Sequence, residues 1–206
     1  YDKTKEQGGI LQGDSVINGI LERLRSPLIG IAGGFQEGAE AYFMAAQIGL
    51  EFDGEGVLSL NSTTLDEALA NNYEAVLKLI GAMGMGASSS NYIQFTSAYS
   101  TTTAGSYEVE VDFDGEGNVT AARIRTQGET AWRDLTVEGS TLSGAEGSPE
   151  QGLVLTAVWD GASSTQTATV RVLEGLVGTV SNRVNAMLDA VSGVIVSRRS
   201  TMPVLS

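Results

Sequence analysis

The sequence predicts an α+β fold in which both ends of the chain form a bundle-like helical body with a small β-hairpin, and an antiparallel β domain is inserted between them. Three observations support this prediction. Apolar residues recur at helical spacing up to about residue 85, alternate with polar residues after it, and return to helical spacing from Ala168. We therefore place the helical body at residues 1–85 and 168–206, and the all-β domain at residues 86–167.

The first helix is expected within GDSVINGILERLRSPL. Asp14 or Ser15 can cap its start, and Pro27 is expected to stop it. One face of this helix carries the apolar residues Val16, Ile17, Ile20, Leu21 and Leu24. The segment QEGAEAYFMAAQ, residues 36–47, is expected to continue as a second helical stretch that a glycine interrupts.

A hairpin is expected near residues 48–60, where apolar residues alternate on both sides of an Asp-Gly pair. The next helix, TLDEALANNYEAVLKLIG, is expected to begin with a capping box of Thr64 and Glu67. Gly81 suits its C-terminal cap. The expected buried stripe of this helix consists of Leu65, Leu69, Val76 and Ile80.

The β domain is expected to hold roughly five strands, since three or more strands with an apolar face can fold independently. A small polar hinge, ASSSN, precedes them. The expected strands are YIQF, SYEVEVDF, NVTAARIRT, WRDLTVEG and GLVLTAVWDG. In the second of these, Tyr107, Val109, Val111 and Phe113 alternate with acidic residues, which is typical of a strand with one buried face.

The last helix is expected to carry a heptad seam. Its candidate assembly and packing residues are Leu173, Val177, Val180, Val184, Met187 and Val191, with Val194 continuing the spacing. Such a seam needs a partner helix, and the helices before residue 85 are the nearest candidates. Glycines within the segment weaken an isolated helix, so either packing holds it or a close approach of another helix requires the glycines.

Composition excludes several classes of function. The 206 residues carry a net charge of −13 with a pI near 4.3, and no basic cluster is long enough to bind nucleic acid. No apolar run is long enough to cross a bilayer. The chain has no cysteine and no histidine, which removes thiol chemistry, the commonest general base and the commonest zinc ligand. Neither the serines at 88–90 nor the glycines of GAMGMG have the partners that catalysis or phosphate binding needs. We expect no catalytic residue and no cofactor.

Two similar segments, EFDGEGVL at 51–58 and VDFDGEGN at 111–118, begin like calcium-binding loops. An EF-hand loop needs a bidentate glutamate at its twelfth position. Counting from Asp112 puts Arg123 there, and counting from Glu51 puts Ser62 there. Neither loop can complete a coordination shell alone. Both are therefore predicted to be hairpin turns, and no metal site is expected.

Two long segments resemble a known family. They are GGILQGDSVINGILERLRSPL and AAQIGLEFDGEGVLSLNSTTLDEALANNYEAVLKLI. The matching residues are Gly13-Asp14-Ser15, Ile48-Gly49-Leu50, Gly56-Val57-Leu58-Ser59-Leu60, Leu65, Ala68-Leu69, Asn71 and Val76. Their order is similar to that of the C-terminal half of flagellar hook-associated protein 2, the bacterial filament cap family also called FliD. Asn61 and Ile80 depart from the Leu-Asp and Leu-Phe pairs that are usual in this family.

The resemblance implies a structural, non-enzymatic protein of motility, secreted to the extracellular tip of the bacterial flagellum. There it would form a homo-oligomeric ring and promote the folding and insertion of flagellin, with flagellin and the hook–filament junction proteins as partners. The terminal coiled-coil segments and N-terminal β domains of the family lie outside this sequence. The resemblance therefore implies a core fragment whose ring formation depends on those segments. Neither nucleic acid nor membrane insertion is implied.

Two functions from other classes also fit the residues. Trp132 or Trp159 on an exposed face would make the β domain an adhesin or carbohydrate-binding module. That role in cell adhesion is compatible with a cap protein. Two acidic side chains converging on one pocket would instead make the chain a carboxylate-based hydrolase. Solvent exposure of the two indoles tests the first function, and the placement of the acids tests the second.

Overall fold

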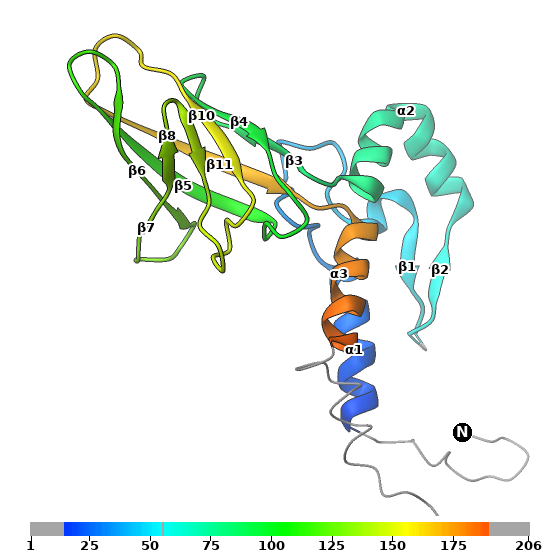
Figure 1. Cartoon of the computed structure of the whole chain (residues 1–206). Helices are drawn as coiled ribbons and strands as arrows, with labels where there is room; N and C mark the ends of the chain where they lie inside the picture. Colours follow the sequence, from blue (N-terminus) through cyan, green and yellow to red (C-terminus); the bar gives the residue numbers. More distant parts are fainter. Residues whose placement is uncertain (1–14, 55, 190–206) are drawn as a thin grey trace, which may run out of the picture.

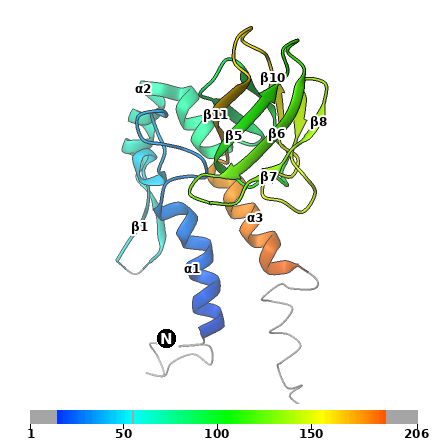
Figure 2. The same cartoon turned by 90° about the vertical axis from the view of Figure 1, so that its left-hand side faces the viewer.

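The computed structural model describes residues 15–54 and 56–189, which form a β sandwich and a helical part beside it. The sandwich extends to one side, and α1 and α3 project away from it with their outer ends at the same end of the molecule (Figures 1 and 2). The combination of helices with antiparallel sheets confirms the α+β class.

The helices are α1 (Ser15–Ile29), the short 3-10 helix η1 (Ala45–Ile48), α2 (Ser62–Gly81) and α3 (Leu176–Leu188). The strands are β1 (Leu50–Phe52), β2 (Leu58–Leu60), β3 (Met85–Ser88), β4 (Ile93–Ser97), β5 (Gly105–Phe113), β6 (Val119–Thr126), β7 (Arg133–Asp134), β8 (Thr136–Glu138), β9 (Thr141–Ser143), β10 (Val154–Ala157) and β11 (Thr165–Leu173).

The stop predicted at Pro27 in α1 is wrong, because the helix continues to Ile29. A proline removes one backbone donor and crowds the preceding turn, but this one lies in the last turn of the helix. The Gly30 N–H still reaches the Ser26 carbonyl at 3.4 Å, so the turn closes before the chain leaves the helix.

The second helical stretch predicted at residues 36–47 is also wrong, apart from the single turn of η1. Residues 30–44 instead form an irregular segment, which we call the bridging loop. Gly34 and Gly38 have φ angles of 72° and 82°, a conformation that breaks a right-handed helix. Contacts with the sandwich, described below, hold the loop in this shape.

The predicted hairpin is confirmed: β1 and β2 pair antiparallel, with Leu50 opposite Leu60. Helix α2 follows directly, but its cap is Asn61 rather than Thr64, since the Asn61 side chain accepts from the Thr64 N–H at 3.2 Å. Asn is at least as good a cap as Thr, and the helix begins three residues earlier for that reason. Gly81 is its last residue and Ala82 its C-cap.

The β domain contains nine strands rather than five, arranged in two sheets. The five-stranded sheet has the order β3-β11-β5-β6-β7, and the four-stranded sheet has the order β4-β10-β9-β8. The segment predicted as a hinge begins with the end of β3, which pairs with β11. Short strands such as β7 and β9 carry too few residues to show an alternating pattern in the sequence.

The helical spacing expected from Ala168 is wrong for its first part. Residues Thr165–Leu173 form β11, which pairs with β5 along nearly its whole length. Alternate residues Gln166, Ala168, Val170 and Val172 face the core with a period of two, and Leu173, the first residue of the predicted seam, ends this strand. The boundary at 168 therefore lies inside the sandwich, and α3 begins only at Leu176.

Two apolar cores result. In the sandwich the inner faces of both sheets meet, and the fully buried residues include Ile93, Val111, Ile124, Leu142, Leu155 and Val170. In the helical part, α2, η1 and the start of α3 bury Ile48, Val76, Leu79, Leu173 and Leu176. Leu173 ends a sandwich strand but belongs to the helical core, so the chain is anchored where it crosses between the two parts.

Candidate assembly surface

Exposed large apolar side chains gather on the helical part. Of the fifteen that the described residues expose, eleven lie outside the sandwich strands and their loops: Leu21, Ile29, Ile31, Val57, Leu58, Leu60, Tyr73, Leu77, Met83, Val177 and Leu188. One face of the five-stranded sheet, by contrast, carries ion pairs such as Glu108–Arg125 and Glu110–Arg123. Exposed apolar surface that is concentrated in one region is typical of an interaction site.

The β1–β2 hairpin contributes the most regular part of this surface. Cross-strand pairing puts Leu50, Phe52, Leu58 and Leu60 on one face. The β1 side is braced by α1, because the Arg25 guanidinium lies 5.9 Å from the Phe52 ring centroid and donates to the Gly56 carbonyl at 2.9 Å. On the β2 side, Leu58 and Leu60 are 45% and 51% exposed.

The predicted heptad seam lies only partly in a helix. Leu173 is a strand residue, as the pairing of β11 shows, and Val177 in the first turn of α3 is 59% exposed. Val180 and Val184 are half-buried and Met187 is buried. Helix α3 contacts α1 and α2, so it packs within the chain. Val191 and Val194 lie outside the described residues, and an assembly role for the seam stays a prediction.

The two calcium-like segments are hairpin turns, as predicted. In the β5–β6 turn, the Asp114 carboxylate accepts from the Glu116 and Asn118 N–H groups at 2.8 and 2.9 Å. Hydrogen bonds from the side chain and backbone of Asn118, and from Glu116, lower the pKa of Asp114. In the β1–β2 turn, Asp53 accepts from the Val57 N–H at 2.9 Å. These carboxylates stabilise the turns from within, and no group of three or more acidic residues among those described could hold a metal ion.

Neither tryptophan forms an open platform for a sugar. Trp159 is half-buried against the sandwich core, and its indole N–H donates to the Ser163 carbonyl at 2.9 Å. Above Trp132, the guanidinium carbons of Arg125 and Arg123 lie 4.4 and 5.0 Å from the ring centroid. Both indoles are therefore occupied by contacts within the chain, and the carbohydrate-binding alternative gains no support.

The hydrolase alternative requires two acidic side chains that converge on one pocket. Glu40 and Glu74 line one open hollow of about 300 Å³, but Glu40 is ion-paired there with Arg171 and Lys78. Burial favours the protonated form of Glu40 most strongly of the single influences, yet the Gln36 N–H and the two cations together outweigh it and lower its pKa. A carboxylate held ionised in this way is a poor general acid.

The three serines at 88–90 are likewise held by hydrogen bonds within the chain. The hydroxyl oxygens of Ser88 and Ser90 accept from the N–H groups of Ser90 and Tyr92, and that of Ser89 accepts from the Thr169 N–H. They shape the end of β3 and the turn after it.

Two buried ion pairs were not predicted from the sequence. Glu40 pairs with Arg171, which is 131 residues away, and the completely buried Glu150 pairs with Arg133. Acidic and basic residues this far apart in sequence carry no local pattern, so only the folded topology reveals them. The exposed leucines of β2 were read correctly as part of a hairpin, but their exposure depends on what the rest of the chain leaves uncovered.

None of the described helices is long and apolar enough to span a membrane. Comparison with the curated proteins and with the solved structures gives no match. The family model for the C-terminus of flagellar hook-associated protein 2 matches residues 1–203, nearly the whole chain. The predicted resemblance is thus confirmed, and the chain belongs to the flagellar hook-associated protein 2 C-terminal family.

Proposed function

We propose that this chain is part of a filament cap at the extracellular tip of a bacterial flagellum, where it promotes the folding and insertion of flagellin. The observation that carries the proposal, besides the family, is the concentration of exposed apolar side chains on the helical part and its hairpin. The partners are other copies of the chain in a ring, flagellin, and the hook–filament junction proteins.

The mechanism is steric and makes no use of a chemical step. Exposed leucines and valines at the hairpin and on α3 offer apolar contact, which is non-directional and tolerates changes of partner and register. A ring built on such contacts can keep an incoming subunit enclosed while it folds. The sandwich, with charged pairs on its surface, faces solvent or the incoming subunits.

The two ends of the chain form one helical body in this proposal, with the sandwich as an inserted module. Residues 15–54, 56–84 and 174–189 are its described parts. Of the predicted seam, Val180, Val184 and Met187 hold α3 within the body, and the exposed Val177 extends the contact surface. Val191, a further candidate for assembly, lies outside the described residues.

A motility assay tests the proposal. The variant Leu58→Ser/Leu60→Ser removes the exposed apolar side of the hairpin, and Tyr92→Ser/Val158→Ser is a matched control because both of its residues are exposed on the sandwich. Each is returned to a strain that lacks its own cap protein. We expect the hairpin variant to swarm poorly and to lose more flagellin into the medium than the control.

Circular dichroism of both purified variants establishes that each remains folded. Full swarming and parental flagellin retention by a folded Leu58→Ser/Leu60→Ser protein would contradict the assignment of the hairpin to the assembly surface.

A further inference from the structure

The sandwich joins the helical part through two crossings that lie side by side. Residues 82–84 lead from α2 into β3, and residues 174–175 lead from β11 into α3. The Gly175 N–H donates to the Ala82 carbonyl at 2.8 Å, so the two crossings are hydrogen-bonded to each other. Two adjacent crossings define an axis, and a few residues at the ends of elements are enough to form a hinge about it.

The bridging loop supplies further contacts, one at the second crossing and one with the sandwich strand β5. The Gly33 carbonyl accepts from the Glu174 N–H at 2.9 Å, and the Gln36 amide donates to the Ser106 hydroxyl in β5 at 3.1 Å. Both contacts are single hydrogen bonds, and the one from Gln36 is exposed to solvent.

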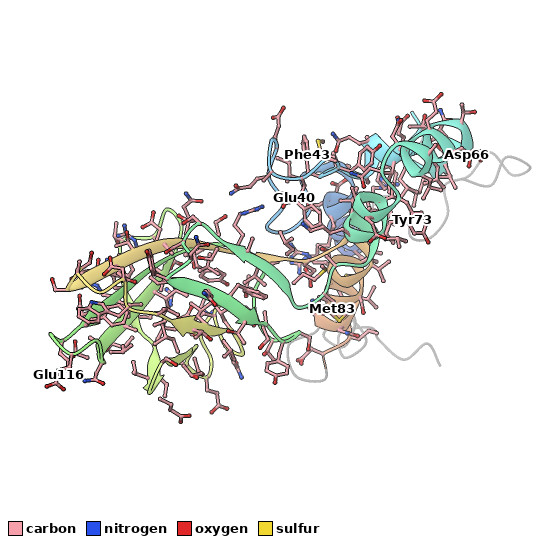
Figure 3. All side chains as sticks on the ribbon, turned by 90° about the horizontal axis from the view of Figure 1, so that it is seen from above. Glu40, Phe43, Asp66, Tyr73, Met83 and Glu116 are labelled. Carbon is pink, nitrogen blue, oxygen red and sulfur yellow. The ribbon has the colours of Figure 1, made fainter. Side chains whose placement is uncertain are left out.

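Glu40, near the end of this loop, is different because it is buried and charged. Both of its carboxylate oxygens lie 2.9 Å from Nη1 of Arg171 in β11, and Lys78 Nζ in α2 lies 3.6 Å from Oε1. The Gln36 N–H donates to Oε2 at 2.8 Å. One carboxylate therefore binds a sandwich strand, a helix of the helical part and its own loop, and Figure 3 shows Glu40 between the two parts.

The charge of Glu40 also neutralises two cations that belong to different parts of the molecule. The Glu40 side chain is 4% exposed, and those of Arg171 and Lys78 are 16% and 35% exposed. Without the carboxylate, the two cations would face each other across a partly buried junction, where repulsion is screened less than at an open surface. Loss of Glu40 thus replaces an attraction between the two parts by a repulsion.

We propose that the Glu40 carboxylate is an electrostatic latch that fixes the orientation of the β sandwich on the helical part. With the latch closed the two parts move as one body. With it open, the sandwich turns about the paired crossings at 82–84 and 174–175. This inference concerns the mechanics of the chain and holds whether or not the chain serves in a cap.

Distance measurement between two spin labels tests the latch directly. Because the sequence has no cysteine, the pair Glu67→Cys in α2 and Glu138→Cys in β8 labels one exposed site in each part. Pulsed electron–electron double resonance then measures the distance distribution between the two labels in the parent, in Glu40→Met and in Glu37→Gln, which changes an exposed acid in the same loop. We expect one narrow distance distribution in the parent and the control, and a distribution about twofold broader or more in Glu40→Met.

The double variant Glu40→Met/Arg171→Met separates a latch from simple destabilisation. It leaves no unpaired charge on the sandwich side, so the protein folds without the strain of the single variant. The latch predicts that the distribution stays broad. A narrow distribution in both Glu40 variants, or one restored by the double variant, would overturn the proposal.

Discussion

Removal of Arg133 should destabilise the sandwich strongly, because it leaves the buried Glu150 carboxylate without its cation. The Glu150 carboxylate is completely buried and accepts from Nε of Arg133 at 2.8 and 3.0 Å. Hydrogen bonds to the side chains of Glu150 and Glu129, assisted by their negative charges, hold the pKa of Arg133 above its ordinary value. Arg133→Met keeps the aliphatic part of the side chain and leaves Glu150 without its cation.

The expected loss of unfolding free energy follows from the burial of the ion pair. Breaking a buried ion pair by removing one partner costs roughly 3–5 kcal/mol. The Arg133 side chain is 27% exposed, so water can reach part of the site, and we expect a loss near the lower limit, about 3 kcal/mol. The double variant Arg133→Met/Glu150→Met removes both charges and should recover most of this loss, since an apolar pair of similar volume is often as stable as the ion pair.

Urea unfolding followed by tryptophan fluorescence measures the unfolding free energy of the sandwich. The chain has two tryptophans, Trp132 and Trp159, and both belong to the sandwich. Glu129→Gln is the control, because Glu129 pairs with the same arginine from the exposed side and its loss should leave the midpoint nearly unchanged. The reasoning is refuted if Arg133→Met loses no more stability than this control, or if the double variant is as unstable as the single one.

Three further predictions follow from the same geometry. Tyr107→Phe removes a buried hydroxyl that donates to the carbonyls of Thr103 and Pro149, and should lower the unfolding free energy of the sandwich by about 1–2 kcal/mol in the same urea assay. Gly175→Ala places a Cβ 2.7 Å from the backbone of Ala82, so hydrogen exchange at residues 82–85 should accelerate relative to the exposed control Gly81→Ala. The latch should also depend on pH: Glu40 is faced by Arg171, Lys78, the Gln36 N–H and, across the hollow, Glu74, and its pKa in the folded state is lowered. The contribution of the Glu40 carboxylate to the latch is therefore complete above the ordinary glutamate pKa and is lost as pH falls through the lowered value. The distance distribution of the two spin labels should stay narrow from neutral to mildly acidic pH and broaden only at lower pH. Broadening between pH 7 and pH 6 would contradict this assignment.

Local patterns carried most of what the sequence predicted correctly. The Asp-Gly turns of both hairpins and the alternation of Tyr107, Val109 and Val111 each depend on residues close together in the chain. The C-terminal region was ambiguous because Val170 and Val172 follow a strand alternation, whereas Leu173 is the first residue of an apolar spacing typical of a helix. Pairing of β11 with β5 decides between them, and that pairing joins segments more than fifty residues apart.

The bridging loop shows where local reasoning ends. Its alanines and glutamates favour a helix by intrinsic propensity, but Glu40 is drawn to Arg171 on a distant strand and Gly34 packs against the Val172 carbonyl. The exposed side of the hairpin was equally out of reach, since Leu58 and Leu60 are apolar residues that a sequence alone places in a core. The family match supplied the reason to read that exposure as an assembly surface.

The native mass of the chain extended by its natural flanking sequences, measured over a range of concentrations, tests the central claim most directly. The account predicts a ring of several copies that Leu58→Ser/Leu60→Ser weakens and Tyr92→Ser/Val158→Ser leaves intact. A monomer at every concentration in the extended form would contradict assembly through the helical part and would remove the basis for a cap.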